Sequence, residues 1–321
     1  MIEAVPWRPR ASNSCLRARA KLNETIRAFF AEREVLEVET PLLARHTVTD
    51  PNLEPLAVET SQASKAPRYL QTSPEFAMKR LLASGSGSIF QLCKAFRDGE
   101  LGHRHNPEFT MLEWYRPHFT MVELMDEVAA LVDATLGESN CIRMTYRDAF
   151  RELLAIDPWE CSRKALLASV QAHTSCRTSE LDRDSCLDLL LSHCIEPEFA
   201  NRGRVFLYDY PPSQAALAAC AMVDGVQVAK RFELYVDGIE LANGYQELLD
   251  AAELKRRVRL DNQELRTAGR SQRLVDPQFE GAMQHGLPDC AGVALGVDRL
   301  LMLTVGKSDV RDVLAFDWLR A

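Results

Sequence analysis

The chain has 321 residues, 46% hydrophobic and 26% charged, so it can bury the core of one large globular domain or two small ones. Its net charge of −8 argues against binding nucleic acid through a broad basic surface. The nine cysteines include no C-x-x-C pair, and their odd number argues against a complete disulfide framework, so reduced thiols are expected.

No segment of the sequence predicts export or insertion into a membrane. The N-terminus, MIEAVPWRPR, has an acid and prolines where a signal peptide would have an apolar run. The apolar run AALAACAMV, at residues 215–223, is too short to cross a bilayer. We therefore expect a cytoplasmic protein.

The first predicted element is an amphipathic helix, because apolar residues recur at i, i+4, i+7 and i+8: Leu22, Ile26, Phe29 and Phe30. The segment VLEVETP follows and predicts a short strand that ends at its proline. Residues 45–67 are polar and rich in turn formers, so we expect a loop with short strands.

TSPEFAMKRLLAS predicts a second helix, in which Ser73 suits the N-cap and Pro74 the first helical position. Two stretches that alternate apolar and polar residues come next, SIFQLCKAFRD and EFTMLEWYRP. They predict an antiparallel hairpin, and the connecting loop is longer than usual, which suggests a functional loop.

The strand EFTMLEWYRP places a carboxylate among aromatic side chains. Side chains alternate between faces along a strand, so one face carries Phe109, Met111, Glu113 and Tyr115. An edge charge beside core aromatics is the simple structural interpretation. A carboxylate on a buried face needs a partner, however, and a cationic ligand would supply one.

The rest of the chain completes an α+β pattern. Helices are predicted over residues 122–136 and 184–194, with a mostly helical region between them, and RVFLYDYP predicts a strand. RFELYVDGIELANG predicts a tight hairpin turning at Asp-Gly, residues 237–238, and a helix follows over 251–260. AGVALGVDRLLML predicts a strand, a glycine turn and a helix. Antiparallel strands with segregated helices indicate an α+β fold.

The predicted hairpin brings two acids together. With a two-residue turn, Tyr235 pairs with Glu240 and Glu233 pairs with Ala242. Glu233 and Glu240 then lie diagonally on one face, close enough to converge. Two adjacent carboxylates repel unless a cation lies between them, and with phosphate oxygens they would suit Mg²⁺. A solvated polar face explains the same pattern equally well.

Other candidate residues also have structural alternatives. Glu75 opens a helix, where acids are common, and Asn243 and Glu247 flank a Gly-Tyr-Gln bend. Arg299 follows a glycine turn at a helix start, where N–H groups favour anions. His105 lacks metal ligands at useful spacing, so contact with phosphate is the better expectation. The chain contains neither a P-loop motif nor a nucleophile elbow.

Together these segments resemble the catalytic core of a class II aminoacyl-tRNA synthetase. The helix–strand stretch ending at Pro41 resembles the first motif of that family, residues 96–116 the second and residues 292–303 the third. RHNPEFTMLEWY and NGYQE are most similar to lysyl-tRNA synthetases. An anticodon-binding domain would have no room beside these motifs, so we expect residues 1–321 to form one catalytic domain.

This core-only arrangement resembles a paralogous family, the elongation factor P–lysine ligases. Ser73 stands where lysyl-tRNA synthetases usually have Ala, and Ala294 where they usually have Gly. The resemblance implies activation of (R)-β-lysine with ATP and Mg²⁺, and its transfer to a lysine side chain of elongation factor P. It also implies a homodimer that does not use tRNA.

The resemblance implies a role for each matching position. Arg97 and Arg299 would clamp the phosphates and act in catalysis, and Glu233 and Glu240 would hold Mg²⁺. The other ATP-binding positions would be Asp98, Gly99, His105, Asn106, Phe109, Glu240, Leu241 and Gly296. The amino acid would be held by Ser73, Pro74, Glu75, Glu113, Tyr115, Asn243, Glu247 and Ala294.

The chain departs from the family at one point. The family has Arg-Asn-Glu where this sequence reads Arg97-Asp98-Gly99, and the acid arrives one position later at Glu100. Adenine would then be read either by Glu100, brought into place through Gly99, or by backbone groups.

The implied mechanism is in-line attack of the substrate carboxylate on the α-phosphorus of ATP, which requires positioning and charge stabilisation and no nucleophilic side chain. Three acids, Glu75, Glu113 and Glu247, suit a substrate with two amines. The alternatives are a minimal synthetase that charges tRNA, an inactive paralogue used for binding, and an amide-forming ligase like asparagine synthetases of this fold. The acids argue against the last, because aspartate would be repelled.

Overall fold

The computed structural model describes residues 7–61, 67–176 and 180–321. The N-terminal segment is therefore described only from Trp7, and residues 62–66 of the predicted loop lie outside the described residues. The α-helices of the described chain are α1 (Asn13–Ala31), α2 (Glu75–Ala83), α3 (Met121–Leu136), α4 (Tyr146–Leu154), α5 (Arg163–His173), α6 (Arg183–Leu190), α7 (Glu196–Phe199), α8 (Ala251–Thr267), α9 (Pro277–His285) and α10 (Val297–Thr304). Its strands are β1 (Leu36–Glu37), β2 (Leu43–Ala44), β3 (Ala57–Val58), β4 (Arg68–Leu70), β5 (Ile89–Phe96), β6 (Glu108–Pro117), β7 (Cys141–Thr145), β8 (Arg204–Tyr210), β9 (Cys220–Val223), β10 (Val226–Val236), β11 (Ile239–Gln246) and β12 (Cys290–Gly296).

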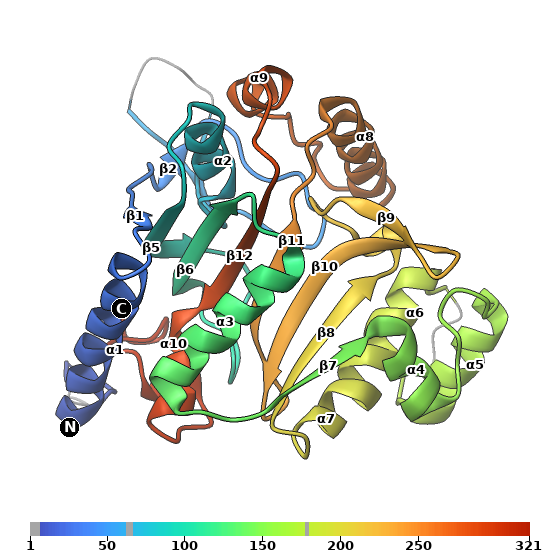
Figure 1. Ribbon diagram of the computed structural model, residues 1–321, viewed down its shortest axis with the longest axis horizontal. Helices are drawn as coiled ribbons and strands as arrows, with labels where there is room; N and C mark the ends of the chain where they lie inside the picture. Colours follow the sequence, from blue (N-terminus) through green and yellow to red (C-terminus); the bar gives the residue numbers. More distant parts are fainter. Residues whose placement is uncertain (1–6, 62–66, 177–179) are drawn as a thin grey trace, which may run out of the picture.

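A large sheet forms the centre of the described part of the chain (Figure 1). Its strand order is β1-β5-β6-β12-β11-β10-β8-β7, with β9 paired to β10, and a small second sheet has the order β2-β4-β3. Neighbouring strands are antiparallel except for the pairs β1–β5 and β7–β8. Helices flank this sheet, so the predicted α+β architecture is confirmed.

One face of the large sheet is closed by α1, α3 and α10, which pack on it as the main core. Trp114 of β6 is fully buried there, and its ring lies 5.3 Å from that of Phe30 on α1. The Phe30 ring also stacks on Phe90 of β5 at 4.5 Å. The predicted apolar face of the first helix and the predicted alternation along β6 are both confirmed.

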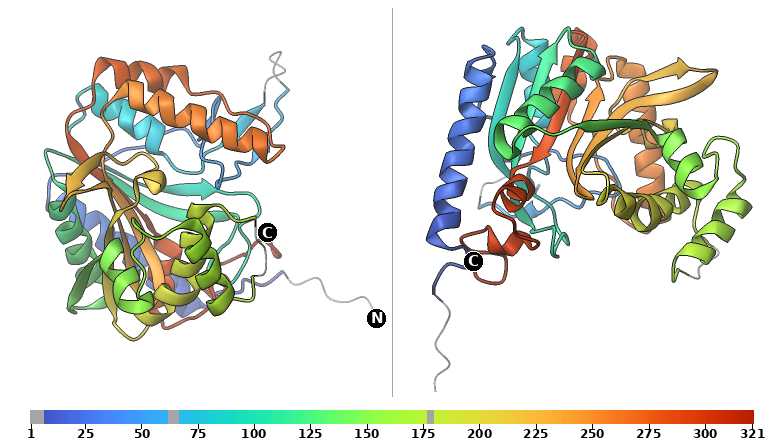
Figure 2. Two further views of the ribbon diagram at one scale, coloured as in Figure 1. Left: turned by 90° about the vertical axis from the view of Figure 1, so that its right-hand side faces the viewer. Right: turned by 60° about the horizontal axis from the view of Figure 1, so that its bottom comes forward.

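Two groups of helices pack on the opposite face, one at each end. At one end α2, α8 and α9 pack around Phe279 and Met283, and at the other α4 to α7 form a separate cluster around Tyr146 and Phe150. Figure 2 shows these two groups of helices on either side of the strands. The stretch of sheet between them is where the candidate site lies.

Several predicted element limits are wrong. α8 ends at Thr267, well beyond residue 260, because Leu265 is buried and extends the apolar stripe. α6 ends at Leu190 and passes into a π-helical turn, Leu191–Ile195, before α7. α2 begins at Glu75, although the Ser73 hydroxyl still accepts a hydrogen bond from the Glu75 N–H at 3.0 Å.

The predicted pairing of Glu233 with Ala242 is also wrong. The turn at residues 237–238 forms as expected, and Tyr235 does pair with Glu240. A β-bulge at Leu241 then shifts the register, so that Glu233 pairs with Asn243. The reason is packing: the extra residue lets Leu241 and Ala242 both enter the main core, each 2% exposed, while the acids keep the other face.

All nine cysteines are free thiols in the structure. Across the described residues, no helix combines the length and the apolar character that a membrane crossing requires.

Candidate active site

A polar row crosses the middle of the open sheet face. In strand order from β10 to β5, the paired residues are Glu233, Asn243, Ala294, Glu113 and Gln91. Paired residues project to the same face, and their chain neighbours fill the main core on the other side. Ala294, the smallest side chain of the row, lies at its centre and is partly exposed, which leaves space above it.

Two oxygen atoms of this row have no hydrogen-bond donor within the described residues. They are the side-chain Oε1 of Gln91 and Oδ1 of Asn243, and both are buried. A buried acceptor without a donor is costly, so most such atoms in folded proteins are paired. The row is therefore suited to a guest that brings N–H donors. Asn243 was a predicted site residue, whereas sequence analysis missed Gln91, whose only signal was its place in the hairpin opposite Glu113.

Glu113 is the most deeply enclosed acid of the row, at 2% exposure. Its Oε2 accepts a hydrogen bond from the Ser73 hydroxyl and its Oε1 one from the Tyr115 hydroxyl, both at 2.7 Å. Burial, with the nearby charge of Glu75 adding to it, raises the pKa of Glu113 to about 8. In the ligand-free protein this carboxyl therefore holds a proton at neutral pH, and an arriving cation would release it.

A buried lysine joins the predicted acids. Lys79 Nζ on α2 is 1% exposed and lies 2.6 Å from Glu75 Oε1 and 2.5 Å from Glu247 Oε2. Burial alone would lower the pKa of Lys79, but the carboxylates of Glu247 and Glu75 outweigh it and raise that pKa. Sequence analysis missed this residue, and its signal was the i, i+4 spacing from Glu75 on a helix face that is otherwise apolar.

The acid partner Glu247 and the phenol Tyr115 lie side by side because residue 292 is glycine. A Cβ at Gly292 would stand 2.4 Å from the Tyr115 ring and 2.5 Å from Glu247 Oε1. Burial raises the pKa of Glu247 to about 7, with the charge of Lys79 opposing it. Sequence analysis placed Gly292 only at the start of the third motif. Pro74, another predicted residue, is buried at the N-terminal end of α2.

Arg299, at the start of α10, faces the second part of the site. Its Nη1 donates to the backbone oxygen of Glu240 at 2.7 Å and lies 3.2 Å from the Glu240 carboxylate. Its Nη2 lies 2.7 Å from His105 Nε2. Burial and then the guanidinium charge lower the pKa of His105, so the imidazole stays neutral and accepts this hydrogen bond. The structure thus brings these three predicted residues together.

Arg97 lies on the same side, over the ring of Phe109, with 5.1 Å from the guanidinium carbon to the ring centroid. Gly99 has φ +77°, and the turn it forms brings Glu100 back until its carboxylate is 3.6 Å from Arg97 Nη1. Asp98 folds onto the same turn, its Oδ1 accepting from the Gly99 N–H at 2.9 Å. The displaced acid therefore does reach Arg97.

Three further predicted ATP-binding residues, Asn106, Leu241 and Gly296, have different surroundings. The Asn106 amide is engaged on both sides, donating to the Glu108 carbonyl at 2.7 Å and accepting from the Trp318 N–H at 3.0 Å. The side chain of Leu241 is in the main core, so only its backbone faces the site. A Cβ at Gly296 would make ordinary contact with the Arg299 side chain, the nearest atom at 3.6 Å, so Gly296 lies directly beside Arg299.

The two predicted metal ligands, Glu233 and Glu240, differ in how many protein groups already contact their carboxylates. Glu233 Oε2 accepts from the hydroxyls of Tyr210 and Tyr235 at 2.7 and 2.5 Å, and its Oε1 lies 2.5 Å from Arg231 Nη2. Glu240 is partly exposed, and among the contacts described its carboxylate meets only Arg299. Glu240 therefore fits a cation bridged by phosphate, whereas Glu233 would first have to release its own donors. No cluster of three or more metal-binding side chains is present in the described ranges.

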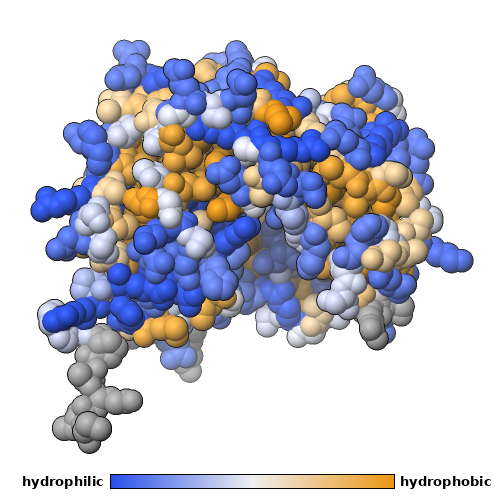
Figure 3. All heavy atoms as spheres, turned by 90° about the horizontal axis from the view of Figure 1, so that it is seen from below, coloured by the Kyte–Doolittle hydropathy of each residue, from blue (hydrophilic) through white to orange (hydrophobic). Residues whose placement is uncertain are grey.

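The molecular surface is hollowed near this region. Seen from below, Figure 3 shows a recess lined largely by hydrophilic residues, between the part of the molecule that carries the termini and the part that carries α4 to α6.

Known proteins resemble the chain over nearly its whole length. The family described as tRNA synthetases class II (D, K and N) matches residues 3–319. The elongation factor P–(R)-beta-lysine ligase of Pseudoalteromonas translucida (strain TAC 125) is 47% identical over 320 residues, 98% of each chain. Proteins of the same name from Pasteurella multocida (strain Pm70) and Salmonella gallinarum (strain 287/91 / NCTC 13346) are 45% identical over 320 and 321 residues, again 98% of each chain.

Proposed function

The chain belongs to the class II tRNA synthetase family of the D, K and N type, and from this premise we propose that it is an elongation factor P–(R)-β-lysine ligase. It activates (R)-β-lysine with ATP as an acyl-adenylate and transfers the acyl group to a lysine side chain of elongation factor P. The names of the relatives, at 45–47% identity, favour this activity over a tRNA-charging enzyme and over an inactive paralogue.

One observation from the structure carries the choice of substrate. The site holds three acids, Glu75, Glu113 and Glu247, and only Lys79 among the described residues pairs with them. The two orphan oxygens of Gln91 and Asn243 add acceptors to this excess of negative charge. A guest with two ammonium groups supplies both the charge and the donors that are missing, whereas aspartate would be repelled.

The other half of the site suits the triphosphate. Arg97 and Arg299 present two guanidinium groups, and in the ligand-free protein each is held by an acid, Glu100 or Glu240. Phosphate oxygens would replace these acids as partners, in shorter charge-assisted hydrogen bonds. His105 and Phe109 border the same region, where they would meet the phosphates and the adenine ring.

The chemistry needs positioning and not a side-chain nucleophile. A carboxylate oxygen of (R)-β-lysine attacks the α-phosphorus, and the bond to pyrophosphate breaks while the two arginines stabilise the negative charge. The uncharged lysine amine of elongation factor P then attacks the acyl carbon. An amide bond forms, AMP leaves, and the amine proton passes to solvent. Mg²⁺ held by Glu240 would neutralise charge on the phosphates.

Pyrophosphate exchange tests the activation step directly. The purified protein is given ATP, Mg²⁺ and labelled pyrophosphate with (R)-β-lysine, L-lysine or aspartate. Exchange with (R)-β-lysine above that with L-lysine, and none with aspartate, is expected. A second assay offers the adenylate either elongation factor P or tRNA. Transfer to tRNA with none to elongation factor P would reject the proposal, as would the absence of exchange with every diamino acid.

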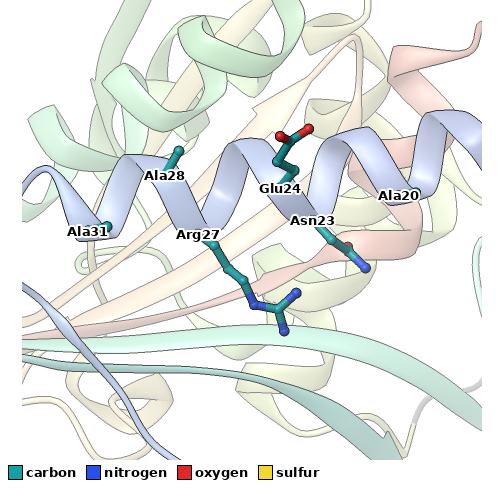
Figure 4. Close-up of a pocket in the computed structure, with 6 residues that line it drawn as sticks. All are labelled: Ala20, Asn23, Glu24, Arg27, Ala28 and Ala31. Atoms are coloured by element: carbon teal, nitrogen blue, oxygen red, sulfur yellow. The ribbon is translucent and has the colours of Figure 1, made fainter.

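We further propose a homodimer formed through α1 and β1, which correspond to the first motif of the family. A shallow hollow on the outer face of α1 is lined by small and polar residues: Ala20, Asn23, Glu24, Arg27, Ala28 and Ala31 (Figure 4). Beside it, Leu36 of β1 is 56% exposed, and the neighbouring Glu37 is tied to α1 through Arg27 at 3.0 Å. A second copy would cover this surface.

We also propose that the chain forms one catalytic domain and is located in the cytoplasm. Continuous pairing from β1 to β7 joins distant segments around one sheet, which supports a single catalytic domain over the described residues. Nine unpaired cysteines support a reducing compartment, the cytoplasm.

A further inference from the structure

Lys79 carries its charge at a buried position, where an unpaired charge would strongly destabilise the fold. Its side chain is 1% exposed, inside the apolar packing of α2 against α9, which includes its neighbours Met78 and Leu82. A buried ammonium is tolerated only with close partners of opposite charge. Lys79 has two, Glu75 Oε1 at 2.6 Å and Glu247 Oε2 at 2.5 Å, and both are acids proposed above to hold the substrate.

The lysine uses only one oxygen of each acid. The other oxygen of Glu247, Oε1, lies over Gly292, beside the Tyr115 ring and on the open face of the sheet. Glu75 retains 17% exposure of its side chain and stands at the first position of α2, next to Ser73. The titratable groups around this ammonium come from α2, β6, β12 and the segment after β11: Glu75, Glu113, Tyr115, Cys290 and Glu247.

We propose that Lys79 is a positioning residue for substrate selection: a built-in ammonium that favours the ionised forms of Glu75 and Glu247 and leaves the second oxygen of each acid for the guest. This inference rests on the proposed function, because it concerns how that pocket selects its amino acid. Three acids less one internal cation leave two negative charges, which match a guest with two ammonium groups. Lys79 does not touch the reacting atoms.

Removal of the ammonium changes the proton count of the pocket. Glu113 already holds a proton in the ligand-free protein, because its pKa is raised to about 8, and a dicationic guest must expel that proton. The pKa of Glu247 is raised to about 7 even though the charge of Lys79 opposes the rise, so without that charge Glu247 would also be protonated at neutral pH. Binding of the guest would then release two protons.

The test measures KM for L-lysine and for ATP by pyrophosphate exchange between pH 7 and 8, in the wild type and three variants. Lys79→Met removes the charge at similar length, Lys79→Arg keeps it, and Arg80→Met removes an exposed charge one residue along the same helix. In the wild type, KM for L-lysine is expected to fall about tenfold per pH unit, which corresponds to release of about one proton. In Lys79→Met the fall should be about a hundredfold per unit, with KM for ATP unchanged.

Lys79→Arg and Arg80→Met should both keep the wild-type slope. An unchanged slope in Lys79→Met would overturn the inference, and so would a parallel rise in KM for ATP and L-lysine, because that indicates a general structural defect. If Lys79→Met does not fold, Lys79→Gln gives the same comparison. A wild-type protein that exchanges with no diamino acid would instead reject the proposed function, so the two failures are distinct.

Discussion

At the scale of single residues, Glu113 carries the clearest conflict between stability and binding. Its pKa is raised from 4.5 to about 8, mainly by burial. The folded protein therefore holds a proton that the unfolded chain releases above pH 4.5, so stability falls as pH rises from 4.5 and stops falling near 8. A guest ammonium removes this penalty, because it favours the ionised form.

Glu113→Gln should separate these two effects. The ligand-free variant should be more stable than the wild type at pH 8, by about 1–3 kcal/mol, and equally stable at pH 4.5. L-Lysine should raise the melting temperature of the wild type and leave that of the variant unchanged. Thermal unfolding at the two pH values checks this, and an equal difference at both would show that the buried charge is not the cause.

Gly292 lies where any side chain would collide with neighbouring side chains. In Gly292→Ala the new Cβ would stand 2.4 Å from the Tyr115 ring and 2.5 Å from Glu247 Oε1, so one of these groups must move. We expect a loss of about 1–3 kcal/mol in stability from overpacking. KM for the amino acid should rise while KM for ATP stays the same, as measured by pyrophosphate exchange.

Gly281→Ala on α9 is the matched control for Gly292→Ala. A Cβ at residue 281 has nothing within 4 Å, and alanine is the better helix former there, so activity should be unchanged and stability equal or slightly higher. If Gly292→Ala behaved like this control, the close packing of Glu247 against Tyr115 would not matter for binding.

The residues that the sequence could predict are those whose signal is local. Alternation along EFTMLEWYRP places Glu113 and Tyr115 on one face, and the structure agrees. Lys79 and Gln91 were missed because their importance depends on contacts with residues distant in sequence. Lys79 meets Glu247 across 168 positions (247 − 79), and no local pattern encodes that contact.

At the scale of elements, turns and apolar periods were predictable, whereas bulges and element ends were not. The Asp-Gly turn at residues 237–238 follows from its dipeptide, because both positions need positive φ. The bulge at Leu241 depends on how much apolar volume the core under β11 accepts, which only the packed structure decides. The missed bulge is why Glu233 was assigned the wrong partner.

The same hairpin turn gives a prediction about stability. Gly238 has φ +73°, and a Cβ there would lie 3.2 Å from both Ala200 Cβ and the Glu196 carbonyl oxygen. Gly225, in the turn between β9 and β10, has φ +80° with nothing within 4 Å. Gly225→Ala should cost about 1 kcal/mol through backbone strain alone, and Gly238→Ala should cost about 1–2 kcal/mol more.

Urea unfolding of the two variants measures this difference in the free energy of unfolding. Because Glu240 and Arg299 meet just beyond this turn, Gly238→Ala should also raise KM for ATP, and Gly225→Ala should not. Equal losses of stability in both variants would mean that the contact with Ala200 is not tight in solution.

At the scale of the whole molecule, charge is divided between two ends of one sheet face. Acids gather around Lys79 where the amino acid would bind, and guanidinium groups gather around Arg299 and Arg97 where ATP would bind. The central polar row joins the two regions, so the carboxylate of the guest would be directed toward the phosphates. A net charge of −8 argues against a broad basic surface for nucleic acid outside this site.

The assembly of two chains into a dimer is also a property of the whole molecule. The outer face of α1 carries Ala28 at its hollow, next to the exposed Leu36 of β1, and a monomer would leave both in water. We expect light scattering to give twice the chain mass of 36.1 kDa at micromolar concentration. Ala28→Arg should reduce it to a single chain, because a long cation cannot fit where two copies of this face meet. Ala252→Arg, at an exposed position of α8, should leave the dimer intact. A wild type that is monomeric, or an Ala28→Arg variant that remains dimeric, would place the interface elsewhere.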